Sequence, residues 1–112
     1  MLKQEYRLKK KYQFNYVYRV GKSYHGKYAM LVFSPSKNKN IKIGISVSKK
    51  VGNSVKRNRA RRLLREAISP FLQSLKNNYN VIVVAKSSIN DQKLASVMQD
   101  IKDSFLKVGL FN

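Results

Sequence analysis

The side chains with the clearest chemical potential in this sequence are basic and lie close together. Residues 49–65 contain eight Lys and Arg residues in seventeen positions, and residues 55–65 contain no acid. Arginine suits phosphate because its planar guanidinium group is always charged and can contact two oxygens at once. A helix face that is merely solvated usually mixes both charges, so that residues four apart can pair. The segment is therefore predicted to bind phosphate groups.

Few side chains are suited to hydrolysing a phosphodiester bond, which usually needs carboxylates that hold Mg²⁺ or a placed general base. The candidates are five acids and one histidine: Glu5, Glu66, Asp91, Asp100, Asp103 and His25. Asp100 and Asp103 are one helical turn apart, which is more typical of a solvated helix face than of a metal site. The sequence has no Gly-rich phosphate loop and no Ser/His/Asp set. We therefore expect no catalytic residue in the protein.

A second group of functional side chains is aromatic. Four rings alternate along a predicted first helix, at Tyr12, Phe14, Tyr16 and Tyr18, with Lys and Arg residues around them. Single-stranded RNA is bound by such mixtures, because unpaired bases stack on rings while cations contact the backbone. Phe14 and Tyr18 are four residues apart and can line a groove together. The alternative is that these rings pack in the core, and it is strongest for Phe14.

The net charge indicates an anionic partner. The 112 residues include 24 Lys and Arg against five Asp and Glu, a formal net charge of +19. A compact domain with this imbalance repels itself unless anions offset it, and solubility alone is better served by acids. Residues 1–65 hold 19 of the bases and one acid, whereas residues 66–112 hold 5 bases and 4 acids. The first part is expected to form the binding surface and the second part the scaffold.

Size and composition are those of one domain, residues 1–112, that begins with a loose basic arm at residues 1–11. The chain contains no cysteine, which excludes disulfides and thiolate metal sites and fits a reducing cytoplasm. Its longest apolar run, residues 81–85, is far shorter than the about 20 residues that cross a bilayer. No apolar run follows the basic start, so a secretory signal is not expected.

Apolar spacing predicts the elements that position these side chains. Residues 12–20 are predicted to form a short helix that ends at Gly21 in the left-handed conformation. Residues 28–33 and residues 41–47 are predicted strands, and the second alternates apolar and polar positions throughout. Residues 80–85 are predicted to form a short, buried strand.

The basic segment is predicted to begin a long helix. Asn53 or Ser54 can cap a helix that starts near Val55. This helix should run at least to Ser69, and Pro70 must kink or end it. One broad face is apolar at 100° per residue: Ala60, Leu63, Leu64, Ala67, Ile68, Phe71 and Leu75. Since five arginines cannot be buried unpaired, the first turns are expected to project past the sheet edge.

The last helix is predicted from near Asp91 to about Val108. It carries an amphipathic stripe: Leu94, Val97, Met98, Ile101 and Phe105. The predicted order of elements is helix, strand, strand, helix, strand, helix. This order is typical of an α+β fold in which three helices pack on a small mixed sheet of about three to four strands.

Residues 46–59 and residues 61–66 together resemble the signature of the protein subunit of bacterial ribonuclease P. The core of the signature is an Arg-Asn-Arg helix, here residues 57–59, entered through a Lys-Lys-x-Gly-Asn turn, here residues 49–53. The resemblance covers nearly the whole chain, including residues 8–10 before the aromatic helix. It implies a left-handed βαβ crossover, as in the ribosomal-protein S5 domain 2-like fold, whereas the common connection is right-handed.

The resemblance also implies a function and partners. The protein subunit joins a catalytic RNA, and the ribonucleoprotein acts as an endonuclease that removes the 5′ leader of precursor tRNA. Catalysis is expected from the RNA and its Mg²⁺ ions, with no metal bound by the protein alone. The protein is expected to be monomeric without RNA, to act in the cytoplasm and to bind no membrane.

Two sets of binding residues follow from the resemblance. The set expected to bind the catalytic RNA is Lys50, Asn53, Lys56, Arg57, Asn58, Arg59, Arg61, Arg62 and Arg65. The set expected to line a cleft for the tRNA leader is Phe14, Tyr18, Val32, Ser46 and Lys49. Some relatives have an aromatic residue near the strand position, so either Val32 or the neighbouring Phe33 is expected to face the cleft.

Three other functions share part of this pattern. A ribosomal-type structural protein would have the same charge but would need no leader groove. A DNA-binding regulator is disfavoured because the sequence has no helix-turn-helix pair or zinc ligands, and its basic helix has few Asn or Gln residues to contact base edges. A self-sufficient nuclease is disfavoured by the small number of acids.

Overall fold

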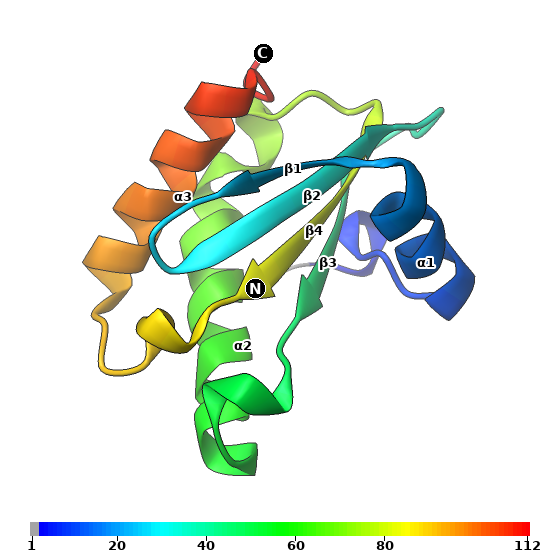
Figure 1. The fold of residues 1–112 in the computed structure, drawn as a ribbon. Coiled ribbons are helices and arrows are strands. Elements are labelled where there is room, and N and C mark those ends of the chain that lie inside the picture. Colours follow the sequence, from blue (N-terminus) through cyan, green and yellow to red (C-terminus); the bar gives the residue numbers. More distant parts are fainter. Residues whose placement is uncertain (1–2) are drawn as a thin grey trace.

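A mixed four-stranded sheet lies at the centre of the computed structural model, which describes residues 3–112. Its strands are β1 (Lys22–His25), β2 (Ala29–Pro35), β3 (Lys42–Ser46) and β4 (Tyr79–Ala85). Their order across the sheet is β1-β2-β4-β3 (Figure 1). Strand β3 runs parallel to β4, and the other neighbouring pairs are antiparallel. The sheet is therefore mixed, as predicted.

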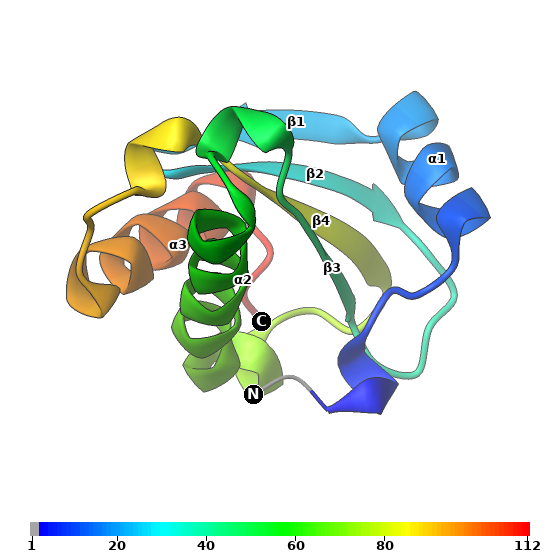
Figure 2. The same cartoon turned by 90° about the horizontal axis from the view of Figure 1, so that it is seen from below.

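Three α-helices cover the two faces of this sheet. They are α1 (Lys11–Val20), α2 (Ser54–Ile68) and α3 (Leu94–Val108). Figure 2 shows α2 and α3 on one face of the sheet and α1 on the other. Short 3₁₀ helices lie between the longer elements: η1 (Gln4–Tyr6), η2 (Lys49–Val51), η3 (Ser69–Ser74) and η4 (Ser87–Ile89). The predicted α+β class, with three helices on a small sheet, is confirmed.

Alternate residues of the central strands build two separate cores, because successive side chains of a strand point to opposite faces. Leu31 and Val83 are fully buried on the face covered by α2 and α3. Val32 and Ile82 are buried on the other face, where Val17 of α1 covers them. Burying a side chain of this size contributes about 1.5–3 kcal/mol. The two cores therefore hold the sheet firmly between its helices.

The connection from β3 through α2 to β4 is left-handed. In Figure 1 the arrows of β3 and β4 both point down. In Figure 2, which is seen from below, β4 lies above β3 and α2 lies to the left of the sheet. A chain that passes from β3 to β4 on that side turns in the left-handed sense, against the usual preference. The expectation taken from the family resemblance is confirmed.

Gly21 ends α1 as predicted, but its conformation is not the predicted left-handed one. Its φ is −77° and its ψ is 161°, an extended conformation. A Cβ atom at this position would lie 2.5 Å from the Val17 carbonyl oxygen and 2.9 Å from that of Phe33. Glycine is needed here because the backbone passes close to two carbonyl groups.

Two further element predictions differ from the structure. Helix α3 begins at Leu94, three residues after its expected start, because Asp91 has a φ of 66° and cannot continue a right-handed helix. Strand β1 was not predicted at all. Its four residues are exposed or half-buried and show no apolar alternation, so only pairing with β2 identifies it.

The residues before α1 lie along the edge of the sheet, although a loose arm was expected. The Leu8 N–H donates a hydrogen bond of 2.9 Å to the Ile43 carbonyl, and the Leu8 side chain is buried. The Lys42 ammonium donates to the Glu5 carbonyl. Residues 3–10 thereby cover β3, whose outer edge would otherwise present unpaired backbone groups. Met1 and Leu2, also part of the expected arm, lie outside the described residues.

Candidate nucleic-acid interface

The basic turn before α2 is built by local hydrogen bonds. The Ser48 hydroxyl accepts from the Lys50 N–H at 3.3 Å, and the Asn53 side chain accepts from the Lys56 N–H at 3.0 Å. Gly52 has a φ of 143°, which residues with a Cβ atom rarely adopt. Asn53 is therefore the helix cap, one of the two candidates that the sequence offered. The turn places Lys49 and Lys50 directly beside the start of α2.

The predicted apolar face of α2 is the buried one, and the basic residues lie outside it. The buried residues are Ala60, Leu63, Leu64, Ala67 and Ile68. Arg59 and Arg62 are exposed, whereas Arg57, Arg61 and Arg65 are half-buried. Figure 1 shows the first turns of α2 extending beyond the ends of β3 and β4. The side chain of Val55 in these turns is 76% exposed, so this end of the helix stands free of the sheet.

Neutral groups hold three of the five arginines of α2, and none of the five forms an ion pair with a carboxylate of residues 3–112. The Arg59 guanidinium donates to the Gln92 carbonyl at 2.7 Å, and that of Arg61 donates to the Asn58 side chain at 3.0 Å. The Arg57 guanidinium has a long contact of 3.4 Å with the Ser54 hydroxyl. Because no acid compensates these cations, their charge is available to an external anion.

Asn90 connects the basic turn to the rest of the molecule and was not singled out from the sequence. Its side-chain amide donates a 2.7 Å hydrogen bond to the Val51 carbonyl in η2. The loop that contains Asn90 also supplies the Gln92 carbonyl that contacts Arg59. One loop therefore supports both the basic turn and Arg59 of α2. Local periodicity could not have indicated it, because the partners are 39 residues apart.

The second predicted surface lies on the other face of the sheet, beside α1. The Phe14 ring rests on Gly44 of β3, since a Cβ atom there would lie 2.5 Å from the ring. Phe14 is half-buried, so the alternative of core packing holds for part of this ring. Tyr18, four residues further along the helix, is 44% exposed. One face of α1 therefore presents a partly accessible aromatic flank.

A row of half-buried residues continues this face of the sheet beyond α1. Met30 pairs with Val84, and Val84 pairs with Ser46, so the three side chains lie side by side. Their strand neighbours two residues away, Val32 and Ile82, are covered by α1. We define Met30, Val84 and Ser46 as the floor row. Met30 and Val84 were not singled out from the sequence. They lie beside Ser46 only because of the register of three strands, which the sequence does not show.

The two candidate strand residues lie on opposite faces of the sheet. Val32 lies on the α1 face, is 5% exposed and packs in the core beneath α1. Phe33 packs on the opposite face, with its ring 6.4 Å from that of Tyr79. Lys49, the last predicted cleft residue, is exposed and follows the end of β3 by three residues.

The two surfaces approach each other around the edge of β3. A hollow of about 260 Å³ there is lined by Phe14 of α1 and Arg65 of α2, together with Arg7 and Lys9 from the N-terminal segment. A second hollow of about 450 Å³ on α2 is lined by Asn58, Arg62, Arg65 and Glu66. Arg65 borders both hollows. The basic helix and the aromatic flank therefore belong to one continuous region of the surface.

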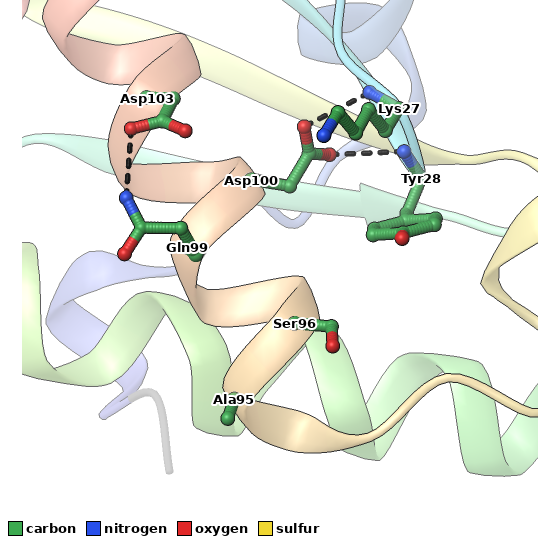
Figure 3. Close-up of a pocket in the computed structure, with 7 residues that line it drawn as sticks. All are labelled: Lys27, Tyr28, Ala95, Ser96, Gln99, Asp100 and Asp103. Atoms are coloured by element: carbon green, nitrogen blue, oxygen red, sulfur yellow. Dashed lines mark hydrogen bonds between the residues drawn. The ribbon is translucent and has the colours of Figure 1, made fainter.

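The paired acids of α3 are engaged in structural contacts. Both oxygens of the Asp100 carboxylate accept hydrogen bonds of 2.9 Å, from the N–H groups of Lys27 and Tyr28 (Figure 3). Asp100 is buried, which corrects the expectation of a solvated pair. Asp103 is exposed and accepts from the Gln99 side chain at 2.8 Å. Asp100 therefore anchors the β1–β2 turn to α3.

Residues 3–112 contain no group of three or more His, Cys, Asp or Glu side chains arranged to hold a metal ion. His25 lies exposed at the end of β1 and belongs to no such group among the described residues. Among the helices that the structure describes, none has the length and apolar character needed to cross a membrane.

Comparison with known sequences gives a consistent picture. The family model described as Ribonuclease P matches residues 2–109. The ribonuclease P protein component of Clostridium botulinum (strain Langeland) is 34% identical over 109 residues, which is 96% of this chain and 98% of that protein. The ribonuclease P protein component of Clostridium novyi is 36% identical over 115 residues, covering 99% of this chain and all of that protein.

Solved structures show the same fold. The RNase P protein of Staphylococcus aureus superimposes with a TM-score of 0.85 and 28% identity, covering 96% of this chain and 98% of that one. The RNase P protein of Thermotoga maritima has a TM-score of 0.78 at 20% identity, covering 87% of this chain and 92% of that one. At this lower identity the likeness concerns the fold alone.

Proposed function

The chain belongs to the ribonuclease P protein family, and from this premise we propose that it acts in the cytoplasm by binding the catalytic RNA through α2 and the tRNA leader through the cleft beside α1. Membership confirms the resemblance drawn from the Arg-Asn-Arg signature. It makes the chain the protein component of an endoribonuclease and implies a role in maturing the 5′ ends of tRNA. The residues that carry this role are the subject of the proposal.

The proposed contact with the catalytic RNA depends on one observation above all. Five arginines lie along α2 outside its buried face, and no carboxylate of the described chain pairs with them. Guanidinium groups that no carboxylate neutralises can each hold a phosphate oxygen pair. The proposed contact residues are Lys50, Asn53, Lys56, Arg57, Asn58, Arg59, Arg61, Arg62 and Arg65.

The proposed leader cleft lies between the aromatic flank of α1 and the floor row. Phe14 and Tyr18 offer rings for stacking, and Met30 and Val84 offer apolar area beside the Ser46 hydroxyl. Stacking tolerates any base, because every base has an aromatic face. Such a cleft would hold a leader regardless of its sequence. Lys49 at the end of β3 would contact the leader's backbone.

The protein's mechanistic contribution is proposed to be positioning. Mg²⁺ supplies the activated nucleophile and stabilises charge in phosphodiester hydrolysis. The described acids do not fit such an ion, since Asp100 is occupied by two backbone N–H groups, so we assign Mg²⁺ mainly to the RNA. Cations of α2 would neutralise phosphates and release their counterions, which reduces repulsion within the complex. Self-repulsion at a net charge of +19 supports a monomer without RNA.

Leader binding would also favour turnover. Only the precursor carries the leader, so affinity supplied by the cleft is lost when the leader is removed. The holoenzyme would then bind precursor tRNA more tightly than mature tRNA. Because mature tRNA lacks the interactions that the leader made, it dissociates from the holoenzyme more readily than the precursor.

Variants of the aromatic flank test the proposed function. In the reconstituted holoenzyme, Phe14→Ala and Tyr18→Ala should each weaken binding of leader-bearing tRNA by about tenfold, the loss of one stacked base. Binding of mature tRNA should stay unchanged, which equilibrium binding to both RNAs measures. Equal losses for the two RNAs would contradict the cleft. Sequencing of RNA that co-purifies with the protein should yield one catalytic RNA; recovery of ribosomal RNA alone would contradict the assigned partner.

A further inference from the structure

A further hollow borders α1 on the flank away from Phe14. Its volume is about 530 Å³, and its lining includes Tyr12, Tyr16 and Arg19 of α1. The opposite wall comes from the sheet, at Pro35 and Asn80 near the ends of β2 and β4. Neither the proposed RNA contacts of α2 nor the proposed leader cleft uses any of these residues.

Helical geometry separates this hollow from the leader cleft. Val17 is fully buried and marks the side of α1 that faces the sheet. At 100° per residue, Phe14 and Tyr18 fall on one side of Val17, whereas Tyr12 and Tyr16 fall on the other. The helix therefore carries two aromatic flanks with a buried seam between them.

The rings of the second flank are accessible. Tyr12 is 67% exposed and Tyr16 is 50% exposed, so core packing does not account for either ring. The Arg19 guanidinium carbon lies 5.6 Å from the centre of the Tyr16 ring, a cation–π arrangement. Rings next to an arginine form a platform on which unpaired bases stack while the cation contacts phosphate.

Asn80 gives the wall of the hollow a defined polar group. Its side-chain oxygen accepts a 2.7 Å hydrogen bond from the Asn38 amide, which also donates to the Tyr79 carbonyl at 3.2 Å. The Ser36 hydroxyl donates to the Asn38 oxygen at 3.1 Å. With its oxygen engaged in this way, Asn80 has an NH₂ group that donates to no atom of residues 3–112. This group can donate to the edge of a stacked base.

We propose that this hollow binds a nucleotide of single-stranded RNA, and specifically a leader nucleotide upstream of those held in the cleft. The base would stack on Tyr12 and Tyr16, the Asn80 amide would donate to its edge, and Arg19 would contact its phosphate. The inference rests on the proposed function of the cleft. It goes further by adding a second leader site that only a longer leader reaches.

Charge and distance support the leader as the occupant. No acid occurs between residues 6 and 65, so nothing in this part of the chain repels a polynucleotide. The two flanks belong to one ten-residue helix, about 10–12 Å across with its side chains. A strand that leaves the cleft therefore needs only a few nucleotides to pass around α1 and enter the hollow.

The test compares precursor tRNAs with a short leader and with a long leader, each bound to the reconstituted holoenzyme. The double variant Tyr12→Ala/Tyr16→Ala should lower affinity for the long leader by about tenfold, the loss of one stacked base. Its affinity for the short leader should match that of the unaltered protein. The matched control Tyr12→Phe/Tyr16→Phe keeps both rings and should retain the affinity for the long leader.

Three outcomes would overturn the proposal. Unchanged affinity for the long leader would show that the hollow holds no leader nucleotide. Equal losses for long leader, short leader and mature tRNA would assign the hollow to the catalytic RNA instead. Equal losses in the ring-keeping control would exclude stacking. Phe14→Ala serves as a reference for the cleft itself. If Phe14→Ala lowers affinity for both precursor tRNAs and the tyrosine variants change neither, only this inference is rejected. If Phe14→Ala lowers neither affinity, the proposed cleft is rejected.

Discussion

The guanidinium groups at the start of α2 differ in how firmly they are held. Arg59 is oriented by the Gln92 carbonyl, and Arg61 by the Asn58 side chain. Arg62 is exposed and makes no hydrogen bond or ion pair with the described chain. A side chain that is already oriented loses less conformational entropy when it binds. Arg59 is therefore expected to contribute more to affinity than an arginine that is free to rotate.

Arginine contacts with phosphate predict a specific salt dependence. The double variant Arg57→Ala/Arg59→Ala should lower the slope of log affinity against log salt by about two, because each phosphate contact contributes about one unit. Titration with the catalytic RNA at several salt concentrations measures this slope. The control Lys102→Ala changes an exposed cation on α3, in the nearly neutral half of the chain, and should leave the slope unaltered. An unaltered slope in the arginine variant would mean that these side chains do not touch phosphate.

The contact between Phe14 and Gly44 predicts coupled stability effects. A Cβ atom at position 44 would lie 2.5 Å from the ring, so Gly44→Ala should lower the free energy of unfolding by about 1–3 kcal/mol. In a Phe14→Ala background the same substitution should cost much less, because the ring is gone. Urea unfolding of the four proteins in this cycle measures the coupling. Additive losses would show that the ring and the glycine do not meet.

At the scale of elements, short irregular segments determine where the regular ones point. Helix α2 is fixed to the sheet by its apolar face, but its free end depends on η2 and on the loop after η4. Helix α1 has its buried seam at Val17 and presents a different surface on each flank. Both proposed binding surfaces thus depend on how a helix packs on the sheet as well as on its own residues.

The link between Asn90 and Val51 predicts a loss of RNA affinity that a purely structural bond would not give. Asn90→Ala removes the 2.7 Å hydrogen bond and should lower the free energy of unfolding by about 1 kcal/mol. The basic turn would then be held less firmly, so the variant should also bind the catalytic RNA more weakly. Asn112→Ala is the matched control, since it removes a similar bond to the Leu75 carbonyl far along the chain from the turn. Equal RNA affinity in the two variants would mean that Asn90 has no positioning role.

At the scale of the whole molecule, charge and scaffold are divided along the chain. The first 65 residues contain 19 bases and one acid, and they supply α1, the N-terminal segment and the arginine turns of α2. The remaining residues supply β4 and α3, which bury much of the core. The fold brings the basic segments together on a scaffold of nearly neutral sequence, so repulsion among them is concentrated where RNA is proposed to bind.

Concentrated repulsion predicts that anions stabilise the free protein. Sulfate or phosphate bound to the folded state should raise the melting temperature, since a ligand that binds only the folded state shifts the equilibrium toward it. Thermal unfolding in sodium sulfate, compared with sodium chloride at equal ionic strength, separates specific binding from screening. A melting temperature that is the same in both salts would contradict the prediction.

Local patterns in the sequence were enough to predict the α+β class, the three α-helices, the apolar face of α2 and the basic signature that the family match confirmed. These properties depend on residues within a few positions of each other, because helical and strand periodicity fix which side chains share a face. The position of Phe14 and Tyr18 on the same side of α1 followed from the same rule.

Only the tertiary structure decided which distant residues meet. Strand register and docking determine how residues 3–10 lie on β3, which sheet face Val32 and Phe33 each occupy, and that Met30 lies beside Val84. Asn90 and Asp100 contact partners 39 and 72 or 73 residues away, and strand β1 exists only through its pairing with β2. Periodicity along the chain carries no information about such contacts, because packing of the whole molecule selects them.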